Sequence, residues 1–175
     1  IAGQIAKLAG CTVVGIAGDD DKLAYCVNEL GFDHVINYKT VGDLQAALTA
    51  VCPNGVNVYL EGVGGALSQA VFNHLSFKAR VVVIGQISQS NLTEPDMGPR
   101  SMRYFLTSRA RMEGFIVGDW APRNAEALAR LSAWLKEGKL RYAEHAVDGL
   151  ENAPAAFIGM LKGANLGKTI VNVAR

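Results

Sequence analysis

Short runs of β-branched residues alternate with helical segments along the chain, and this alternation constrains the fold more than any other feature. Residues 12–18, 56–60 and 79–85 are short apolar runs, typical of strands that are buried on both faces. Residues 19–31 and 42–51 place their apolar side chains on one helical face. This order predicts an α/β fold, with helices covering both faces of a parallel sheet, and right-handed crossovers make it doubly wound.

The remaining segments extend the same pattern. We expect further helices over 1–10, 66–75, 102–110, 121–138 and 150–163, further strands over 34–38, 112–118 and 168–173, and a loop over 86–99. A doubly wound nucleotide-binding fold starts with a strand and a glycine loop, whereas this sequence starts in a helix. We therefore expect that first strand and loop to be missing here, with the neighbouring strands left unpaired, so that the chain is part of a longer polypeptide or receives the strand from another chain.

Composition argues against several classes of function. The net charge of +1, without a basic run, predicts no nucleic-acid partner, and no apolar run is long enough to predict a membrane partner or a signal peptide. The cysteines and histidines show no disulfide, zinc or catalytic spacing, so we expect no metal, reduced and mostly buried thiols, and a cytoplasmic location: Cys11, Cys26, Cys52, His34, His74 and His145.

Ligands of doubly wound sheets bind at the carboxyl ends of the strands, and the first strand end here is uncharged. In a dinucleotide site an acid at this position accepts hydrogen bonds from the adenosine ribose and repels a phosphate on that ribose. The strand instead ends in Ala17 and Gly18, and Lys22 one helical turn later could neutralise a phosphate. Residues 19–21 are all Asp and would cap the helix. The alternative is that Lys22 is only a solvated helix lysine.

The later strand ends carry a tyrosine and several glycines. Tyr38 could stack on the same adenosine, or it could be a rim tyrosine with Thr40 capping the next helix. The glycines in 62–65 allow a close backbone approach to a ligand, or simply a tight turn. Gly85 ends another strand, and residues 163–167 form a further polar turn with glycines.

Several motifs together resemble one family over essentially the whole chain: GQIAKLAGC, ELGFD, INYKT, EGVGG, WLKEGKL, and GLENAPAAFIGMLKG followed by NLGK. The sequence is similar to the zinc-independent medium-chain dehydrogenase/reductases, in the branch of the prostaglandin and curcumin reductases. The resemblance implies a Rossmann-type NADP-binding domain over 1–143. It also implies that a helix and strand within 144–175 return to a catalytic domain that the chain lacks.

The resemblance further implies hydride transfer from NADPH to the carbon–carbon double bond of a small α,β-unsaturated ketone or aldehyde, without a metal. It implies a homodimer joined through the last strand of the sheet, within Met112 to Val117. Lys22 and Tyr38 would bind the phosphorylated adenosine. The glycine turn and the nicotinamide side would be formed by Gly62, Ile84, Gly85, Gln86, Ile87, Ser88, Phe115, Ile116, Val117 and Asn165.

Two positions depart from the family pattern. Relatives usually carry asparagine where this chain has Gly62, and a loop tyrosine where it has Ser90. These departures favour a second reading, a catalytically silent NADPH-binding or structural module. A third reading is an NADPH:quinone reductase of the same superfamily. No catalytic residue can be named from the sequence, and the isolated fragment is expected to be inactive.

Overall fold

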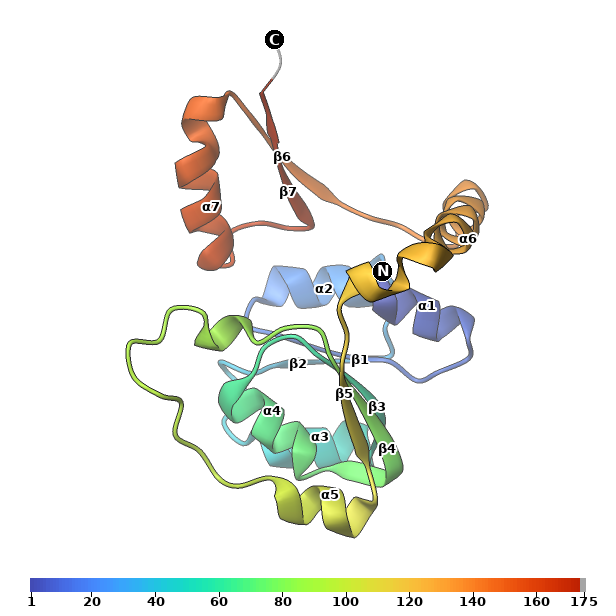
Figure 1. Ribbon diagram of the computed structural model, residues 1–175, viewed down its shortest axis with the longest axis vertical. Helices are drawn as coiled ribbons and strands as arrows, with labels where there is room; N and C mark the ends of the chain where they lie inside the picture. Colours follow the sequence, from blue (N-terminus) through green and yellow to red (C-terminus); the bar gives the residue numbers. More distant parts are fainter. Residues whose placement is uncertain (174–175) are drawn as a thin grey trace.

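The computed structural model describes residues 1–173 as alternating helices and strands (Figure 1). The helices are α1 (Ala2–Leu8), α2 (Asp20–Asn28), α3 (Leu44–Val51), α4 (Gly65–Phe72), α5 (Met102–Ser108), α6 (Asn124–Lys136) and α7 (Ala153–Leu161). The strands are β1 (Val14–Ala17), β2 (His34–Asn37), β3 (Val56–Glu61), β4 (Leu75–Val83), β5 (Arg111–Gly114), β6 (Glu144–Asp148) and β7 (Lys168–Asn172).

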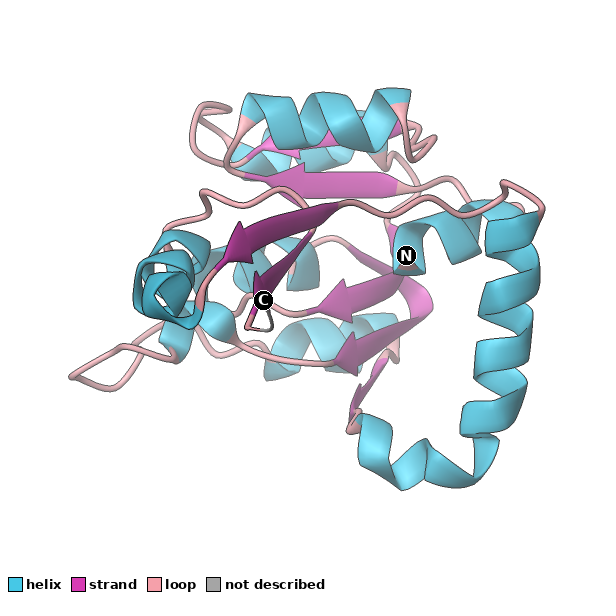
Figure 2. Cartoon of the chain, turned by 90° about the horizontal axis from the view of Figure 1, so that it is seen from above, coloured by secondary structure: helices cyan, strands magenta, loops and turns pink. Residues whose placement is uncertain are grey.

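All the paired strands are parallel, which confirms the α/β class. They form three separate groups, β1-β2, β3-β4-β5 and β6-β7. Within each group the strands run parallel, so their carboxyl ends lie at one edge of that group, and most of the strand arrows in Figure 2 point to the left. A ligand site of a parallel sheet is expected at such an edge.

The expected sheet is interrupted between β1 and β3. Among the described strands β1 pairs only with β2, and β3 pairs only with β4. Each therefore has a free edge, as expected for a doubly wound sheet without its first strand. Such edges leave backbone N–H and C=O groups without ladder partners.

The hydrophobic core lies where β2 meets α3 and α4. Ile36, Leu48 and Val71 are its fully buried members, and partly buried side chains from β1 and β3 pack around them. Burying each such side chain stabilises the fold by about 1.5–3 kcal/mol. The core thus holds β1-β2 and β3-β4-β5 together although no hydrogen bond of a ladder joins them.

Two aspartates cap helices with the same geometry. The Asp19 carboxylate accepts a hydrogen bond from the Lys22 backbone N–H at 3.0 Å, and Asp43 accepts one from the Ala46 N–H at 3.0 Å. The capping role predicted for the acids of 19–21 is confirmed for Asp19. The cap of α3 is Asp43, so the alternative that Thr40 caps this helix is wrong.

The loop before β2 is tied to α1. A Cβ on Gly3 would lie 2.1 Å from the Phe32 ring, so only glycine allows this contact between α1 and the loop. Next to it, the Lys7 ammonium donates to Asp33 at 2.6 Å, and the Val13 N–H donates to the same carboxylate at 2.7 Å. The Lys7 hydrogen bond is the main reason that the pKa of Asp33 is lowered.

Several elements differ from the expectations in their bounds, and one strand was not expected. The helix expected over 66–75 ends at Phe72, because β4 already begins at Leu75. The strand expected over 112–118 spans Arg111–Gly114, and a 3₁₀ segment follows over Val117–Arg123. Strand β6 was not expected at all, because its residues form no apolar run. It is formed by pairing with β7, which lies 24 residues later at each paired position.

Candidate functional site

The carboxyl end of β1, at Gly18, is covered by Tyr38 and Lys39, the two residues that follow β2. The Tyr38 N–H donates to the Ala17 carbonyl at 3.1 Å, which sets the β2 end beside the β1 end. A Cβ on Gly18 would lie 2.7 Å from the Lys39 Cε and 2.9 Å from the Tyr38 ring. Any side chain at position 18, a carboxylate included, would therefore have to displace both of them.

Lys22 lies in the first turn of α2 and is half-buried. Its ammonium donates to the Gly163 carbonyl at 2.5 Å, in the turn that follows α7. Two residues further on, the Asn165 amide donates to the Gly167 carbonyl at 2.7 Å. Lys22 is thus more than a solvated helix lysine, since it joins α2 to the turn that carries Asn165.

Asn37 holds the turn after β2 in place. Its amide oxygen accepts the Lys39 backbone N–H at 3.0 Å, and its amide nitrogen donates to Asp20 at 2.6 Å. The carboxylate of Asp20 is thereby engaged by a neutral partner. We call Gly18, Lys22, Tyr38 and Lys39 the cationic cluster, because its charged members are two lysines.

A buried carboxylate organises the glycine turn after β3. Glu61 ends β3 and is only 1% exposed. Its Oε1 accepts the N–H groups of Val63 at 2.5 Å and Gly64 at 2.9 Å, and its Oε2 accepts the Ser68 hydroxyl. These bonds satisfy free N–H groups ahead of α4, where a negative charge is also favoured by the helix dipole.

The glycine turn in turn supports the loop after β4. The Ile87 N–H donates to the Gly62 carbonyl at 3.2 Å, and the Ser88 N–H donates to the Val63 carbonyl at 2.9 Å. The neighbouring strand joins the same surface, because the Phe115 N–H donates to the Val83 carbonyl at 2.9 Å.

The side chains that this surface exposes are mostly apolar. Ile87 is 57% exposed and Val117 is 69% exposed, while the Phe115 ring stacks on Trp120 with centroids 5.9 Å apart. We call the apolar set at these strand ends the apolar cluster. It consists of the exposed Ile84, Ile87, Ile116 and Val117 and the partly buried Phe115. Apolar side chains concentrated at strand ends favour an apolar or aromatic ligand surface.

The structure therefore gathers the predicted site residues into two groups. Lys22 and Tyr38 lie in the cationic cluster, with Asn165 close to the Gly163 contact of Lys22. The other predicted residues lie in or under the apolar cluster: Gly62, Ile84, Gly85, Gln86, Ile87, Ser88, Phe115, Ile116 and Val117. Their roles towards a cofactor stay predictions.

Two residues of this surface were missed in the sequence. Lys39 directly follows Tyr38, and Glu61 directly precedes the glycines, so both lie inside motifs that had already been singled out. Nothing in the local pattern shows that the Lys39 stem crosses Gly18, or that Glu61 turns back onto the turn that follows it. Only the contacts in the folded chain identify them.

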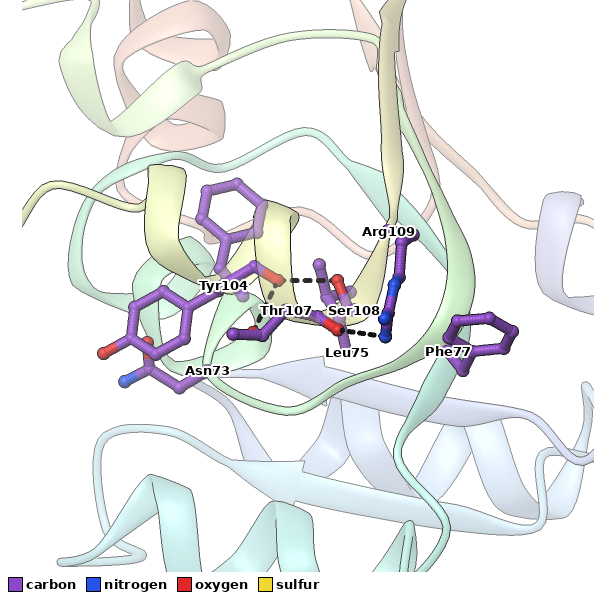
Figure 3. A pocket seen from close by; sticks show the side chains of 8 residues that line it. Asn73, Leu75, Phe77, Tyr104, Thr107, Ser108 and Arg109 are labelled. Carbon is purple, nitrogen blue, oxygen red and sulfur yellow. Dashed lines mark hydrogen bonds between the residues drawn. The ribbon is translucent and has the colours of Figure 1, made fainter.

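A cavity of about 360 Å³ lies away from the strand ends (Figure 3). It lies at the amino end of β4, between Leu75, Phe77 and the end of α5. The hydroxyls of Thr107 and Ser108 donate to backbone carbonyls of α5, and Arg109 donates to the Thr107 carbonyl. Because these polar groups bond to their own helix rather than pointing to a common centre, we assign no site there.

Residues 1–173 contain neither a cluster of metal ligands nor a membrane-spanning helix. In that part of the chain no three His, Cys, Asp or Glu side chains lie close enough together to hold a metal ion. Nor does any helix there have the length and apolar character needed to cross a bilayer. All three cysteines are free, but Cys11 is exposed and the other two are only partly buried, so the expectation of mostly buried thiols is wrong.

Comparison with known proteins relates the chain to a large group of oxidoreductases. The family model described as zinc-binding dehydrogenase matches residues 1–134. Prostaglandin reductase 1 of Rattus norvegicus is 48% identical over 172 residues, 98% of this chain and 52% of that protein. The NADPH-dependent curcumin reductase of Escherichia coli is 42% identical over 177 residues, 98% of this chain and 51% of that protein.

A solved structure agrees with these relatives. The crystal structure of CurA from Vibrio vulnificus in complex with NADPH matches with a TM-score of 0.93 and 44% identity, over 99% of this chain and 52% of that one. The chain thus spans about half the length of the proteins it matches. It belongs to the zinc-binding dehydrogenase family and resembles the prostaglandin and curcumin reductases.

Proposed function

We propose that the chain is the cofactor-binding part of an NADPH-dependent oxidoreductase that reduces the carbon–carbon double bond of α,β-unsaturated ketones or aldehydes. The observation that carries the proposal is the cationic cluster, which offers lysines and no acid at the strand end that contacts a cofactor ribose. The names of the relatives, an NADPH-dependent curcumin reductase and a prostaglandin reductase, support both the cofactor and the reaction class.

The residues present fit NADPH. Gly18 leaves the strand end without a side chain of its own, and Asp19 is occupied as the cap of α2. The Lys22 ammonium has no carboxylate within ion-pair distance among residues 1–173, so its charge is available to a phosphate. Lys22 and Tyr38 would hold the phosphorylated adenosine end.

The apolar cluster would serve the other end of the cofactor. Its exposed side chains would exclude water from the face where the substrate binds. Asn165, expected on the nicotinamide side, lies in the turn that Lys22 contacts. NADPH, when bound, supplies the hydride. The residues of this chain bind and orient, and we propose none of them as a proton donor.

The same proposal divides the chain into two domains. We assign residues 1–143 to the cofactor domain and 144–175 to a catalytic domain, of which residues 174–175 lie outside the described part. In support, β6 pairs only with β7 among the described strands, and α7 leaves Phe157 and Ile158 more than half exposed. An apolar face of this kind suits packing against further protein.

Three further properties complete the proposal. The exposed edge of β5, which pairs only with β4 among the described strands, would join a second copy of the chain, as expected from Met112 to Val117. The reaction would use no zinc. The free cysteines are typical of a reducing compartment such as the cytoplasm.

The proposal is tested on the complete natural polypeptide by titration with NADPH and with NADH, followed by nicotinamide fluorescence. We expect a clear preference for NADPH that Lys22→Ala removes and that Lys136→Ala, a change at an exposed lysine of α6, leaves intact. Turnover with a simple enone, a simple enal and a quinone then separates the activities. Binding without oxidation of NADPH would mean a silent module, and preference for the quinone would mean a quinone reductase.

A further inference from the structure

We propose that Lys39 is the second cation of the phosphate site and that Lys39 and Lys22 together set the preference for NADPH over NADH. This inference rests on the proposed function, and it adds a specificity-determining residue that the sequence motifs did not identify. Its basis is the path of the Lys39 side chain across Gly18.

The position of Lys39 is shown by the space above Gly18. The Lys39 Cε occupies the place where a side chain on Gly18 would begin, at 2.7 Å from the ideal Cβ. In NAD-binding sites the acid near this strand end hydrogen-bonds the ribose hydroxyls. Here the stem of a lysine lies at that strand end, and its ammonium, one bond beyond Cε, lies close to the same strand end.

The turn that carries Lys39 is closed by two hydrogen bonds to Asn37. The Lys39 N–H donates to the Asn37 side chain at 3.0 Å, and the Val41 N–H donates to the Asn37 carbonyl at 3.0 Å. The turn is therefore ordered before any ligand binds. An ordered turn reduces the conformational entropy that binding would otherwise lose.

The acids that follow Gly18 do not form ion pairs with Lys39. Asp19 caps α2, Asp20 accepts the hydrogen bond of the Asn37 amide, and no carboxylate lies within ion-pair distance of Lys39 among the described residues. Lys39 thus keeps an exposed positive charge at the strand end. Within residues 1–173 this charge forms no ion pair that would give it a structural role.

The charge of the ligand calls for a second cation. A phosphate monoester carries about −1.5 to −2 charges at pH 7, and an ammonium carries one positive charge. Lys22 also gives one of its three N–H donors to the Gly163 carbonyl. A second ammonium is needed to balance the phosphate, whereas the ribose hydroxyls of NADH would gain little from it.

The experiment compares the wild-type form of the complete natural polypeptide with Lys22→Gln, Lys39→Gln and the double variant. The dissociation constants of NADPH and NADH are measured by nicotinamide fluorescence at low and at high salt. Lys39→Arg tests whether a positive charge at position 39 is sufficient for the affinity for NADPH. Lys136→Gln is the control for loss of an exposed lysine elsewhere.

We expect Lys39→Gln to weaken NADPH binding about five- to tenfold, to change NADH binding less than twofold, and to reduce the salt dependence of NADPH binding. Lys39→Arg should keep most of the affinity. If wild type prefers NADPH and Lys39→Gln keeps that preference, or weakens both cofactors equally, the role of Lys39 is refuted while the proposed function stands. If wild type shows no preference, the proposed function itself fails.

Discussion

The cationic cluster and the apolar cluster are built in different ways, although both lie at carboxyl ends of strands. The first is formed by side chains, since Lys22 bonds to Gly163 and Lys39 crosses Gly18. The second rests on backbone hydrogen bonds, since the turn after β3, which is held by the buried Glu61, bonds through its carbonyls to Ile87 and Ser88. Substitutions in the first should change what the surface binds, whereas substitutions in the second should change whether the surface forms.

The largest effect is expected for Glu61→Ala, beneath the apolar cluster. It leaves two backbone N–H groups and the Ser68 hydroxyl without their acceptor, so we expect a loss of about 2–4 kcal/mol in the free energy of unfolding. Urea denaturation of the complete natural protein measures it. Glu94→Ala, a change at an exposed carboxylate of the loop after β4, is the matched control. Equal losses in both variants would remove the organising role given to Glu61.

A smaller loss is expected for Gly64→Ala in the same turn. Gly64 has φ 84° and ψ −173°, which non-glycine residues almost never adopt, and a Cβ there would lie 3.1 Å from the Ser88 hydroxyl. We expect a cost of about 1–3 kcal/mol in denaturation experiments. Gly98→Ala, where a Cβ meets nothing within 4 Å, should be close to neutral. An unchanged midpoint for Gly64→Ala would show that the turn tolerates another backbone conformation.

Asp19→Ala tests whether the acids beside the cationic cluster are only structural. Loss of the cap should cost about 1 kcal/mol, and Asp43→Ala should cost the same because it caps α3 with the same geometry. The measurement is the free energy of unfolding of each variant, together with its dissociation constant for NADH. A specific loss of NADH binding in Asp19→Ala would mean that this carboxylate contacts the ribose.

The smallest effect on stability is expected for Gly18→Ala in the cationic cluster. The new methyl group meets the Lys39 stem and the rim of Tyr38, both exposed side chains that can move aside, so stability should change by less than about 1 kcal/mol. The displaced Lys39 should weaken NADPH binding about threefold, by titration. A large loss of stability with unchanged affinity would mean that Gly18 supports the fold rather than ligand binding, the opposite of what is expected for the cationic cluster.

Local sequence patterns predicted most of the elements of the fold. Strands such as β4 and helices such as α2 carry their signal in a few adjacent residues, because burial and capping act over short distances. Strand β6 carries no such signal, since its residues are mostly exposed and its hydrogen bonds go to β7. Its formation depends on pairing between distant segments, which local periodicity does not describe.

The candidate site likewise has features that the sequence predicts and features that only the folded structure shows. The sequence by itself determined the residue types at the strand ends: an uncharged Gly18, a lysine one helical turn later, and glycines after Glu61. The tertiary structure decided that Lys39 covers Gly18, that Lys22 reaches Gly163 and that Glu61 is buried under its own turn. The physical reason is that residue type sets the chemistry a position can offer, whereas the direction of a side chain is set by neighbours that the chain brings together only when it folds.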